Sequence, residues 1–495
     1  MTEPTPNNRR SAALGALMPG FVGTELPEWI AALLREGLGG VCLFGHNVDT
    51  PPQIAALTAA IHAASSNAVV AIDEEGGDVS RLHQRAGSPF PGNAVLGRIG
   101  DVETTRAVGH EVGVQLAEVG IDLTFAPVVD VNSDPDNPVI GVRSFGADPS
   151  IVAAHSTAWT NGVQAAGVGA CAKHFPGHGD TTTDSHVSEP VVTTDAATLN
   201  ARELVPFRAA ITAGTRAIMT SHIRVPALDR DAVATFSPAI LGGLLRDELG
   251  FDGVIVTDAL DMAGASGTIG MPAAAVAAVA AGADLLCLGS KNSEHEVEAI
   301  VDALVCADRD GRIPPGRLVA GARRSGALAQ WATAARSTRT PRDPSTGAAA
   351  IDVGRIASSF ALSARARMRL ASPIGPTRWV RIEPEPNIAV GDTPLGPFFD
   401  GGARPALVVP LDNRDVAVGR RPEPGALTLV VGRELHRDAA ALTAAAAIVD
   451  SCDALVVDLG FVDTGLVDTG VVDIATFGAS RIVGEALLAL IGGAG

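Results

Sequence analysis

Residues 250–262 read GFDGVIVTDALDM, and this stretch decides the fold. A short apolar run, Gly253–Asp258, ends in a carboxylate and is followed by a segment of helical composition. A continuous apolar run of this length is typical of a strand that is buried on both faces in a parallel sheet. In parallel α/β proteins the carboxyl ends of the strands form the edge that holds the functional groups. We therefore predict a buried strand that delivers Asp258 to a functional rim.

Seven more runs of this kind precede or follow it, and helix-like sequence separates them. The full set is Ala13–Pro19, Gly40–Phe44, Ala68–Asp73, Leu123–Val129, Gly169–Phe175, Ala217–Ile223, Gly253–Asp258 and Asp284–Leu288. Polar residues gather at the carboxyl ends of the runs, as in VAIDEEGG, ACAKHFPGHG and MTSHIR. This pattern predicts an α/β protein with a (β/α)8 TIM-like barrel. An open doubly wound sheet would also give strands and helices that alternate along the chain. The dinucleotide-binding motif G-x-G-x-x-G does not follow the first run, so the barrel is favoured.

A linker is expected where the composition changes at RSTRTPRDPSTGAAA, residues 336–350. Beyond it, ALVVPL, LTLVVG and ALVVDLG resemble buried strands separated by helical stretches. We predict a catalytic barrel domain over residues 1–335 and a smaller α/β sandwich domain over residues 351–495. No residue of the sandwich is assigned to chemistry, and we expect it to serve packing or substrate restriction.

The charge and the cysteines limit the partners of the protein. Acidic residues outnumber basic ones by 55 to 37, and the formal net charge of −18 argues against nucleic acid as a partner. The five scattered cysteines are expected to be reduced and packed. No signal peptide or membrane span is expected, so we predict a cytoplasmic enzyme that needs no membrane partner.

The densest polar segment is KHFPGHGDTTTDSH, residues 173–186. Within it Asp184 stands two residues before His186, and a carboxylate in this position can fix the tautomer of the ring and stabilise its protonated form. His186 would then act as both acid and base. A polar surface loop could carry the same triplet without any function.

Three further segments offer carboxylates and arginines. Asp258 can attack an anomeric carbon and form a covalent glycosyl intermediate, or it can cap the following helix. Asp261 is the competing carboxylate, and we expect it to cap or support. In AIDEEGGDVSR, residues 71–81, Asp73 can accept hydrogen bonds from sugar hydroxyls while Arg81 donates, or the two can form one salt bridge. Arg143 is the predicted ligand-facing residue of the polar loop over residues 130–145.

Together KHFPGHGDTTTDSH, AIDEEGG with Arg81, and GFDGVIVTDALDM resemble glycoside hydrolase family 3, in its β-N-acetylglucosaminidase branch. The resemblance covers the barrel. It implies Asp258 as nucleophile, and His186 with its partner Asp184 as acid/base. It also implies sugar contacts from five residues, which are Asp73, Arg81, Arg143, Lys173 and His174.

The predicted function is that of a retaining, exo-acting β-N-acetylglucosaminidase without metal or cofactor. The resemblance makes cell-wall fragments, as in peptidoglycan recycling, or chitobiose plausible substrates. An aromatic content of 4% and the absence of tyrosine favour a compact pocket for one terminal sugar. In a competing mechanism the N-acetyl carbonyl of the substrate itself acts as the nucleophile. The carboxylate predicted at the rim favours instead the mechanism with a covalent glycosyl-enzyme.

Several alternatives stay open on the same residues. A neutral histidine does not repel phosphate, so a glycoside phosphorylase that takes phosphate as acceptor is permitted. A bifunctional β-glucosidase/N-acetylglucosaminidase would use the same site. A metal-dependent barrel hydrolase could use His174, His178, Asp184 and His186, although the expected early H-x-H is missing. A non-catalytic carbohydrate-binding protein is disfavoured by the several rim carboxylates.

Overall fold

The structure is a computed structural model that describes residues 6–181, 190–338, 351–372, 374–383, 389–391, 393–410 and 426–492. The chain forms two compact units. The first comprises Met1–Glu75, Val102–Pro138 and Ala147–Ala349. The second comprises Gly76–Asp101, Val139–Gly146 and Ala350–Gly495.

The first unit is built on eight short parallel strands. They are β1 (Leu17–Met18), β2 (Gly40–Leu43), β3 (Val69–Ile72), β6 (Leu123–Thr124), β7 (Gly169–Phe175), β8 (Ala217–Thr220), β9 (Val254–Val256) and β10 (Leu286–Cys287). Six of them pair in the order β2-β3-β6-β7-β8-β9, and β1 pairs with β10. The amide of Thr257 donates to the carbonyl of Leu285 at 3.0 Å, and that of Cys42 donates to the carbonyl of Pro19 at 3.0 Å. These bonds close the circle, so the predicted (β/α)8 barrel is confirmed.

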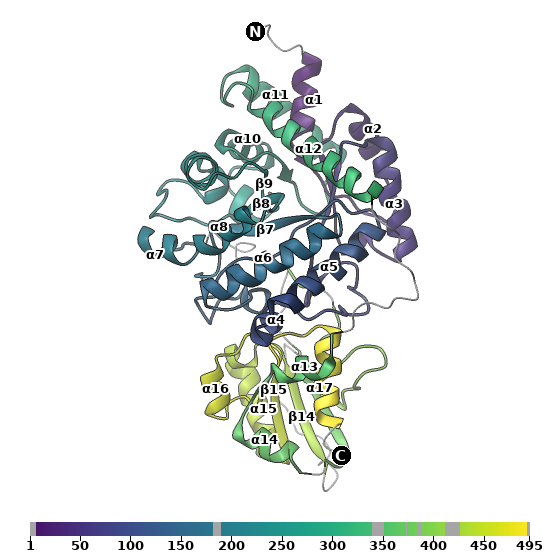
Figure 1. Cartoon of the computed structure of the whole chain (residues 1–495), viewed down its shortest axis with the longest axis vertical. Helices are drawn as coiled ribbons and strands as arrows, with labels where there is room; N and C mark the ends of the chain where they lie inside the picture. Colours follow the sequence, from purple (N-terminus) through teal and green to yellow (C-terminus); the bar gives the residue numbers. More distant parts are fainter. Residues whose placement is uncertain are drawn as a thin grey trace. The chain divides into compact units, whose positions relative to one another are not determined.

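Helices surround these strands in Figure 1. They are α1 (Pro6–Leu14), α2 (Glu28–Glu36), α3 (Pro51–Ala64), α5 (Val102–Glu118), α6 (Pro149–Ala165), α7 (Ala196–Ala201), α8 (Leu204–Thr212), the π-helical η4 (Ala239–Glu248), α9 (Ala263–Ser266), α10 (Met271–Ala281), α11 (Glu294–Arg309) and α12 (Arg317–Thr338). Local sequence fixes several of their starts. Ser293 caps α11 in a capping box, because its side chain accepts from the amide of Glu296 while the Glu296 carboxylate accepts from the Ser293 amide at 2.8 Å.

The barrel interior is filled by residues that alternate along the strands. Val69 and Ala71 of β3, and Val254 and Val256 of β9, belong to one buried cluster with inward residues of the other strands. Leu328 of α12 packs on the same cluster and lies against Gly169, where β7 begins. Because α12 covers this amino-terminal end, the carboxyl ends of the strands are left to form the functional rim.

The second unit contains a six-stranded sheet in the order β11-β16-β15-β14-β12-β13, in which only the edge strand β11 runs antiparallel to its neighbour. The strands are β11 (Ala361–Leu362), β12 (Thr377–Ile382), β13 (Leu407–Val409), β14 (Leu427–Gly432), β15 (Ala454–Asp458) and β16 (Ile474–Ala475). The helices of its carboxyl-terminal part are α13 (Val353–Ser358), α14 (Ala364–Leu370), α15 (Ala439–Val449), α16 (Thr464–Asp468) and α17 (Arg481–Gly492).

This sheet is covered on both faces, as its alternating residues show. Leu429 and Val431 of β14 belong to the apolar cluster that includes residues of α13 and α17, whereas Val430 belongs to the cluster that includes α15. The predicted α/β sandwich is therefore confirmed.

Two stretches from the first third of the chain also belong to the second unit. Residues 76–101 contain α4 (Asn93–Ile99), and residues 139–146 contain the short helix η2 (Gly141–Arg143). The short strands β4 (Glu74–Gly76) and β5 (Val79–Ser80) lie where the chain passes between units. The domain limits proposed from sequence stay a prediction, since α12 continues to Thr338 and residues 339–350 lie outside the described chain.

Two general expectations can be compared with the coordinates. Of the helices described, none combines the length and the apolar character needed to cross a bilayer. All five cysteines lie in the described chain and none of them forms a disulfide; Cys42, Cys171 and Cys287 are buried.

Candidate active site

Three of the predicted site residues share one position relative to the barrel interior. Asp73, Lys173 and Asp258 each stand two residues beyond an inward-facing core residue of their strand, namely Ala71, Cys171 and Val256. If the alternation of each strand is extended by one residue pair, all three side chains are expected on the inner side of the barrel at its carboxyl rim.

The pKa of the Cys171 thiol is affected by three charged groups near it. Burial raises the pKa of Cys171, the positive charge of Lys173 opposes this, and the negative charges of Asp73 and Asp258 add to it. All three ionic groups therefore lie close enough to act on one buried atom of β7.

Lys173 forms a buried ion-paired cluster with two carboxylates. Its Nζ lies 2.8 Å from Oδ1 of Asp73 and 2.8 Å from Oε1 of Glu75. The side chains of Lys173 and Glu75 are each 3% exposed, and that of Asp73 is 22% exposed. The carboxylate oxygens of this cluster are strong hydrogen-bond acceptors, which suits sugar hydroxyls.

Asp130 organises the imidazole of His174. The fully buried carboxylate of Asp130 lies 2.7 Å from Nδ1 of His174 and accepts the backbone amides of His174 and His178. A carboxylate on Nδ1 places the proton there and leaves Nε2 as the atom through which His174 can meet a ligand.

The loop after β7 is packed tightly as far as residue 181. Asn137 donates to the carbonyl of His178 at 2.8 Å, and Nδ1 of His178 lies 2.9 Å from the hydroxyl of Thr181. A side chain at Gly179 would collide with the carbonyl of Val131, so only glycine fits there. Asp184 and His186, the predicted acid/base pair, lie outside the described residues.

Asp258 does not cap the helix that follows it. The first residue before α9 is Met262, and no side chain caps this helix, whereas Oδ1 of Asp258 accepts the amide of Ala259 at 2.8 Å. Asp261 is exposed and its carboxylate lies against Gly289. The helix-cap alternative is therefore wrong for Asp258, and the capping expectation is wrong for Asp261.

His222 supports the backbone beside Asp258. The ring is fully buried, with Nδ1 2.9 Å from the hydroxyl of Thr235 and Nε2 3.1 Å from the carbonyl of Ala259. Since Ala259 follows Asp258 directly, these bonds fix the backbone that carries the Asp258 carboxylate.

Arg81 and Arg143 belong to the second unit and are described there. Arg81 donates to the carbonyls of Ala389 at 2.8 Å and Val390 at 3.4 Å. Arg143 is buried, and its Nη1 donates to the carbonyl of Val139 at 3.1 Å. Backbone carbonyls thus hold both guanidinium groups.

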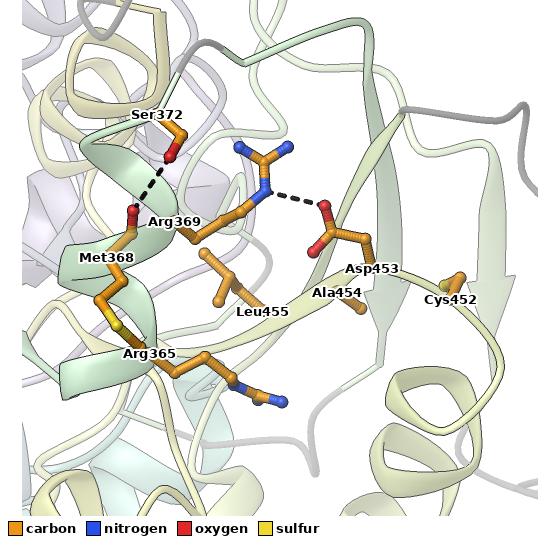
Figure 2. Close-up of a pocket in the computed structure, with 8 residues that line it drawn as sticks. All are labelled: Arg365, Met368, Arg369, Ser372, Cys452, Asp453, Ala454 and Leu455. Carbon is orange, nitrogen blue, oxygen red and sulfur yellow. Dashed lines mark hydrogen bonds and ion pairs between the residues drawn. The ribbon is translucent and has the colours of Figure 1, made fainter.

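A hollow of about 370 Å³ in the second unit lies between α14 and the start of β15 (Figure 2). Two arginines extend into it, but Arg369 pairs with Asp453 at 2.8 Å and Arg365 pairs with Asp473. Because both charges are already matched, and because the hollow lies at the amino end of a strand, we assign no ligand to it. Within the residues that the structure covers, no group of three or more His, Cys, Asp or Glu is arranged to hold a metal ion.

A closed parallel barrel with a buried lysine, imidazoles and carboxylates at its carboxyl rim defines a (β/α)8 enzyme that acts on a small polar ligand. The family described as "Glycosyl hydrolase family 3 N terminal domain" matches residues 22–324. The chain belongs to glycosyl hydrolase family 3, and it is therefore a glycoside hydrolase.

Individual relatives agree with this family. Beta-hexosaminidase A of Pseudoalteromonas piscicida is 41% identical over 285 residues, which are 53% of this chain and 48% of the relative. The chain thus spans about half the length of that relative. Beta-hexosaminidase of Alkalilimnicola ehrlichii is 36% identical over 345 residues, covering 67% of this chain and 97% of the relative. A solved glycoside hydrolase family 3 beta-N-acetylglucosaminidase from Paenibacillus sp. str. FPU-7 is similar with a TM-score of 0.82, 29% identity, and coverage of 98% of this chain and 96% of that one.

Proposed function

We propose that the protein is a retaining, exo-acting β-N-acetylglucosaminidase with Asp258 as nucleophile and His186, assisted by Asp184, as acid/base. The observation that carries this proposal is that Asp258 follows the inward-facing Val256 of β9 by two residues and lies close enough for its charge, like those of Lys173 and Asp73, to act on the buried thiol of Cys171. The names of the relatives support the choice of an N-acetylhexosamine as the sugar.

The reaction runs in two steps that balance in atoms and charge. In the first, an Asp258 carboxylate oxygen bonds to the anomeric carbon while the glycosidic C–O bond breaks, and protonated His186 gives its proton to the leaving oxygen. In the second, neutral His186 takes a proton from water as the water oxygen bonds to the anomeric carbon and the ester to Asp258 breaks. The sugar leaves with its configuration retained.

The sugar contacts follow from the described geometry. Asp73 and Lys173 supply an acceptor and a donor that are already held together, and His174 can meet a hydroxyl through Nε2. Arg81 and Arg143 complete the proposed set, each with a guanidinium held by carbonyls.

A trapping experiment tests the nucleophile. A 5-fluoro-N-acetylglucosaminyl fluoride keeps the 2-acetamido group and slows release, so mass spectrometry of the digested protein is expected to find the sugar on the peptide with Asp258. Asp261→Asn should still be labelled and Asp258→Asn should not. Labelling of another carboxylate, or an active enzyme without any label, contradicts the assignment.

Product analysis tests the rest of the proposal. We expect a β-configured N-acetylglucosamine monomer from the end of a chitooligosaccharide or cell-wall fragment, and no internal oligomers. Parallel reactions with phosphate distinguish the phosphorylase alternative, which predicts a sugar 1-phosphate in place of the free sugar. A panel of nitrophenyl β-sugars measures whether β-glucosides are also cleaved. The cytoplasmic location stays a proposal that fractionation of the native cell would test.

A further inference from the structure

Arg202 and Glu203 form a charged pair beneath the loop that follows β7. They lie between α7 and α8, and Nε of Arg202 donates to Oε1 of Glu203 at 2.6 Å. The side chain of Glu203 has 0% exposure, and its second oxygen, Oε2, has no hydrogen-bond partner in the described chain. Burying a carboxylate oxygen without a hydrogen-bond partner costs free energy. A role for Glu203 other than stabilising the fold would explain why this residue is present.

Glu203 lies against the loop backbone at Gly177. A Cβ at position 177 would sit 2.8 Å from Cβ and 2.9 Å from Oε2 of Glu203. Gly177 also has a φ of +125°, which favours glycine. The loop therefore approaches Glu203 as closely as a backbone can.

Arg202 reaches the same loop further along. Its Nη2 donates to Oδ2 of Asp180 at 2.6 Å, and the hydroxyl of Thr194 donates to that same oxygen. Thr194 lies beyond the segment 182–189, where the chain continues from Pro190, whose carbonyl accepts the amide of Arg224 at 2.9 Å. The Arg202–Asp180–Thr194 contacts thus tie the chain before that segment to the chain after it.

Burial and hydrogen bonds shift the pKa values of the two carboxyl groups in this cluster, Glu203 and Asp180. Burial raises the pKa of Glu203 to about 7, the charge of Arg202 opposes this, and the charges of Asp130 and Asp180 add to it. Burial also acts to raise the pKa of Asp180, but hydrogen bonds from Thr194 and Arg202 outweigh it, so that pKa lies below its ordinary value. Arg202 consequently bridges the ionised carboxylate of Asp180 on the loop and the carboxyl group of Glu203 on its own segment.

We propose that Arg202 and Glu203 are positioning residues that set the backbone on both sides of residues 182–189 and thereby the reach of the acid/base group toward the glycosidic oxygen. The inference rests on the proposed function, which assigns that group to His186. Proton transfer needs a heavy-atom distance near 3 Å, and a displacement of about 1 Å can cost about 100-fold in rate.

The dependence of kcat/KM on the leaving group distinguishes residues that position the acid/base group from residues that only stabilise the fold. A dinitrophenolate leaves without a proton, whereas the sugar alcohol of a disaccharide needs one. Glu203→Gln keeps the shape of the side chain, and Arg202→Lys keeps the charge but loses the forked donor geometry. Arg208→Lys on α8 is the control, because within the described chain the hydrogen bonds of its guanidinium go to Asn200.

We expect kcat/KM for N,N′-diacetylchitobiose to fall about 10- to 100-fold in Glu203→Gln and Arg202→Lys. The value for dinitrophenyl N-acetylglucosaminide should fall less than about threefold in both, and Arg208→Lys should match the wild type for both substrates. Should Glu203→Gln fail to fold, Arg202→Lys decides alone. Equal losses on both substrates, or no loss on either, overturn the inference.

The variant His186→Ala distinguishes a failure of the positioning inference from a failure of the acid/base assignment. If it shows the leaving-group dependence and the two positioning variants do not, only the positioning inference is wrong. If His186→Ala shows no such dependence, the acid/base assignment of the proposed function is wrong and the positioning inference falls with it.

Discussion

Replacing Lys173 by methionine should destabilise the barrel strongly, because it removes a buried cation that lies between the buried carboxylate of Glu75 and the partly buried carboxylate of Asp73. At 2.8 Å and an effective dielectric constant of about 20, each pair of charges has a gross attraction of about 6 kcal/mol, most of which offsets desolvation. Removing one partner of such a cluster costs about 3–5 kcal/mol, since the remaining charges stay buried. We expect this loss in the free energy of unfolding of Lys173→Met at pH 7.5.

Chemical denaturation monitored by tryptophan fluorescence measures the effect, and a double-mutant cycle locates it. Glu75→Gln in the Lys173→Met background should recover at least about 1 kcal/mol, because one of the two stranded charges is gone. Lys291 is exposed, so Lys291→Met is the matched control and should change stability by less than about 0.5 kcal/mol. A cost below about 1 kcal/mol for Lys173→Met, or no recovery in the double variant, refutes the reasoning.

Three further predictions concern the rim. Asp258→Asn should lower kcat by at least about a thousandfold and Asp261→Asn by less than about tenfold, measured on a nitrophenyl substrate, because the charge of Asp258 acts on the buried Cys171 of the barrel whereas Asp261 is exposed. His222→Phe should cost about 1–3 kcal/mol in stability and also lower kcat, since the hydrogen bonds that hold the backbone at Ala259 disappear; unchanged kcat in a folded variant contradicts this role. Glu203 has a folded pKa of about 7, above its ordinary 4.5. Its proton therefore stabilises the fold fully below pH 4.5, and this contribution, about 3 kcal/mol at most, is lost as the pH rises through 7. Denaturation at pH 5 and pH 8 should show a smaller difference in Glu203→Gln than in the wild type, and an equal difference speaks against a titrating Glu203.

The strands of the barrel were predictable because each is buried on both faces and so appears as a continuous apolar run. Their ends were less predictable. The run Ala13–Pro19 begins inside α1, which continues to Leu14, because a helix that packs on the barrel is also apolar on that side. The run Leu123–Val129 is a strand only at Leu123–Thr124, since Pro127 lacks the amide that a central strand needs.

The partners of the site residues were harder to predict than the residues themselves. Glu75 carries no local signal, because β3 ends at Ile72 and β4 begins at Glu74, so Asp73 and Glu75 do not share a strand whose alternation would place them on one face. Asp130 pairs with His174 across 44 positions, and Glu203 meets Gly177 only because α7 and α8 fold back on the loop. No local pattern encodes those approaches, and only the folded chain brings the groups together.

The grouping of residues 76–101 with the second unit could not be predicted for the same reason. Asp78 pairs with Arg433 at 2.9 Å and accepts the amide of Ala479 at 2.7 Å, and both partners lie more than 300 positions away. Neither residue has a motif that would mark it. A buried ion pair of this separation depends on the completed fold, so periodicity and composition carry no signal for it.

Arg81 bears on the expectation that the second unit serves only packing or substrate restriction. Sequence patterns assign no chemical residue to the sandwich, and this stays a prediction. The structure shows that the backbone carbonyls of Ala389 and Val390 accept hydrogen bonds from Arg81. Carbonyls neither attack carbon nor supply protons, but two of them fix the plane of a guanidinium, which decides where its other N–H groups point. The family resemblance implies that Arg81 contacts the sugar, and we propose that these two carbonyls act by orienting the N–H groups that make this contact. Substitution of Arg81 should then raise KM more than it lowers kcat, because a contact made equally in the ground state and the transition state changes binding without changing the chemical step.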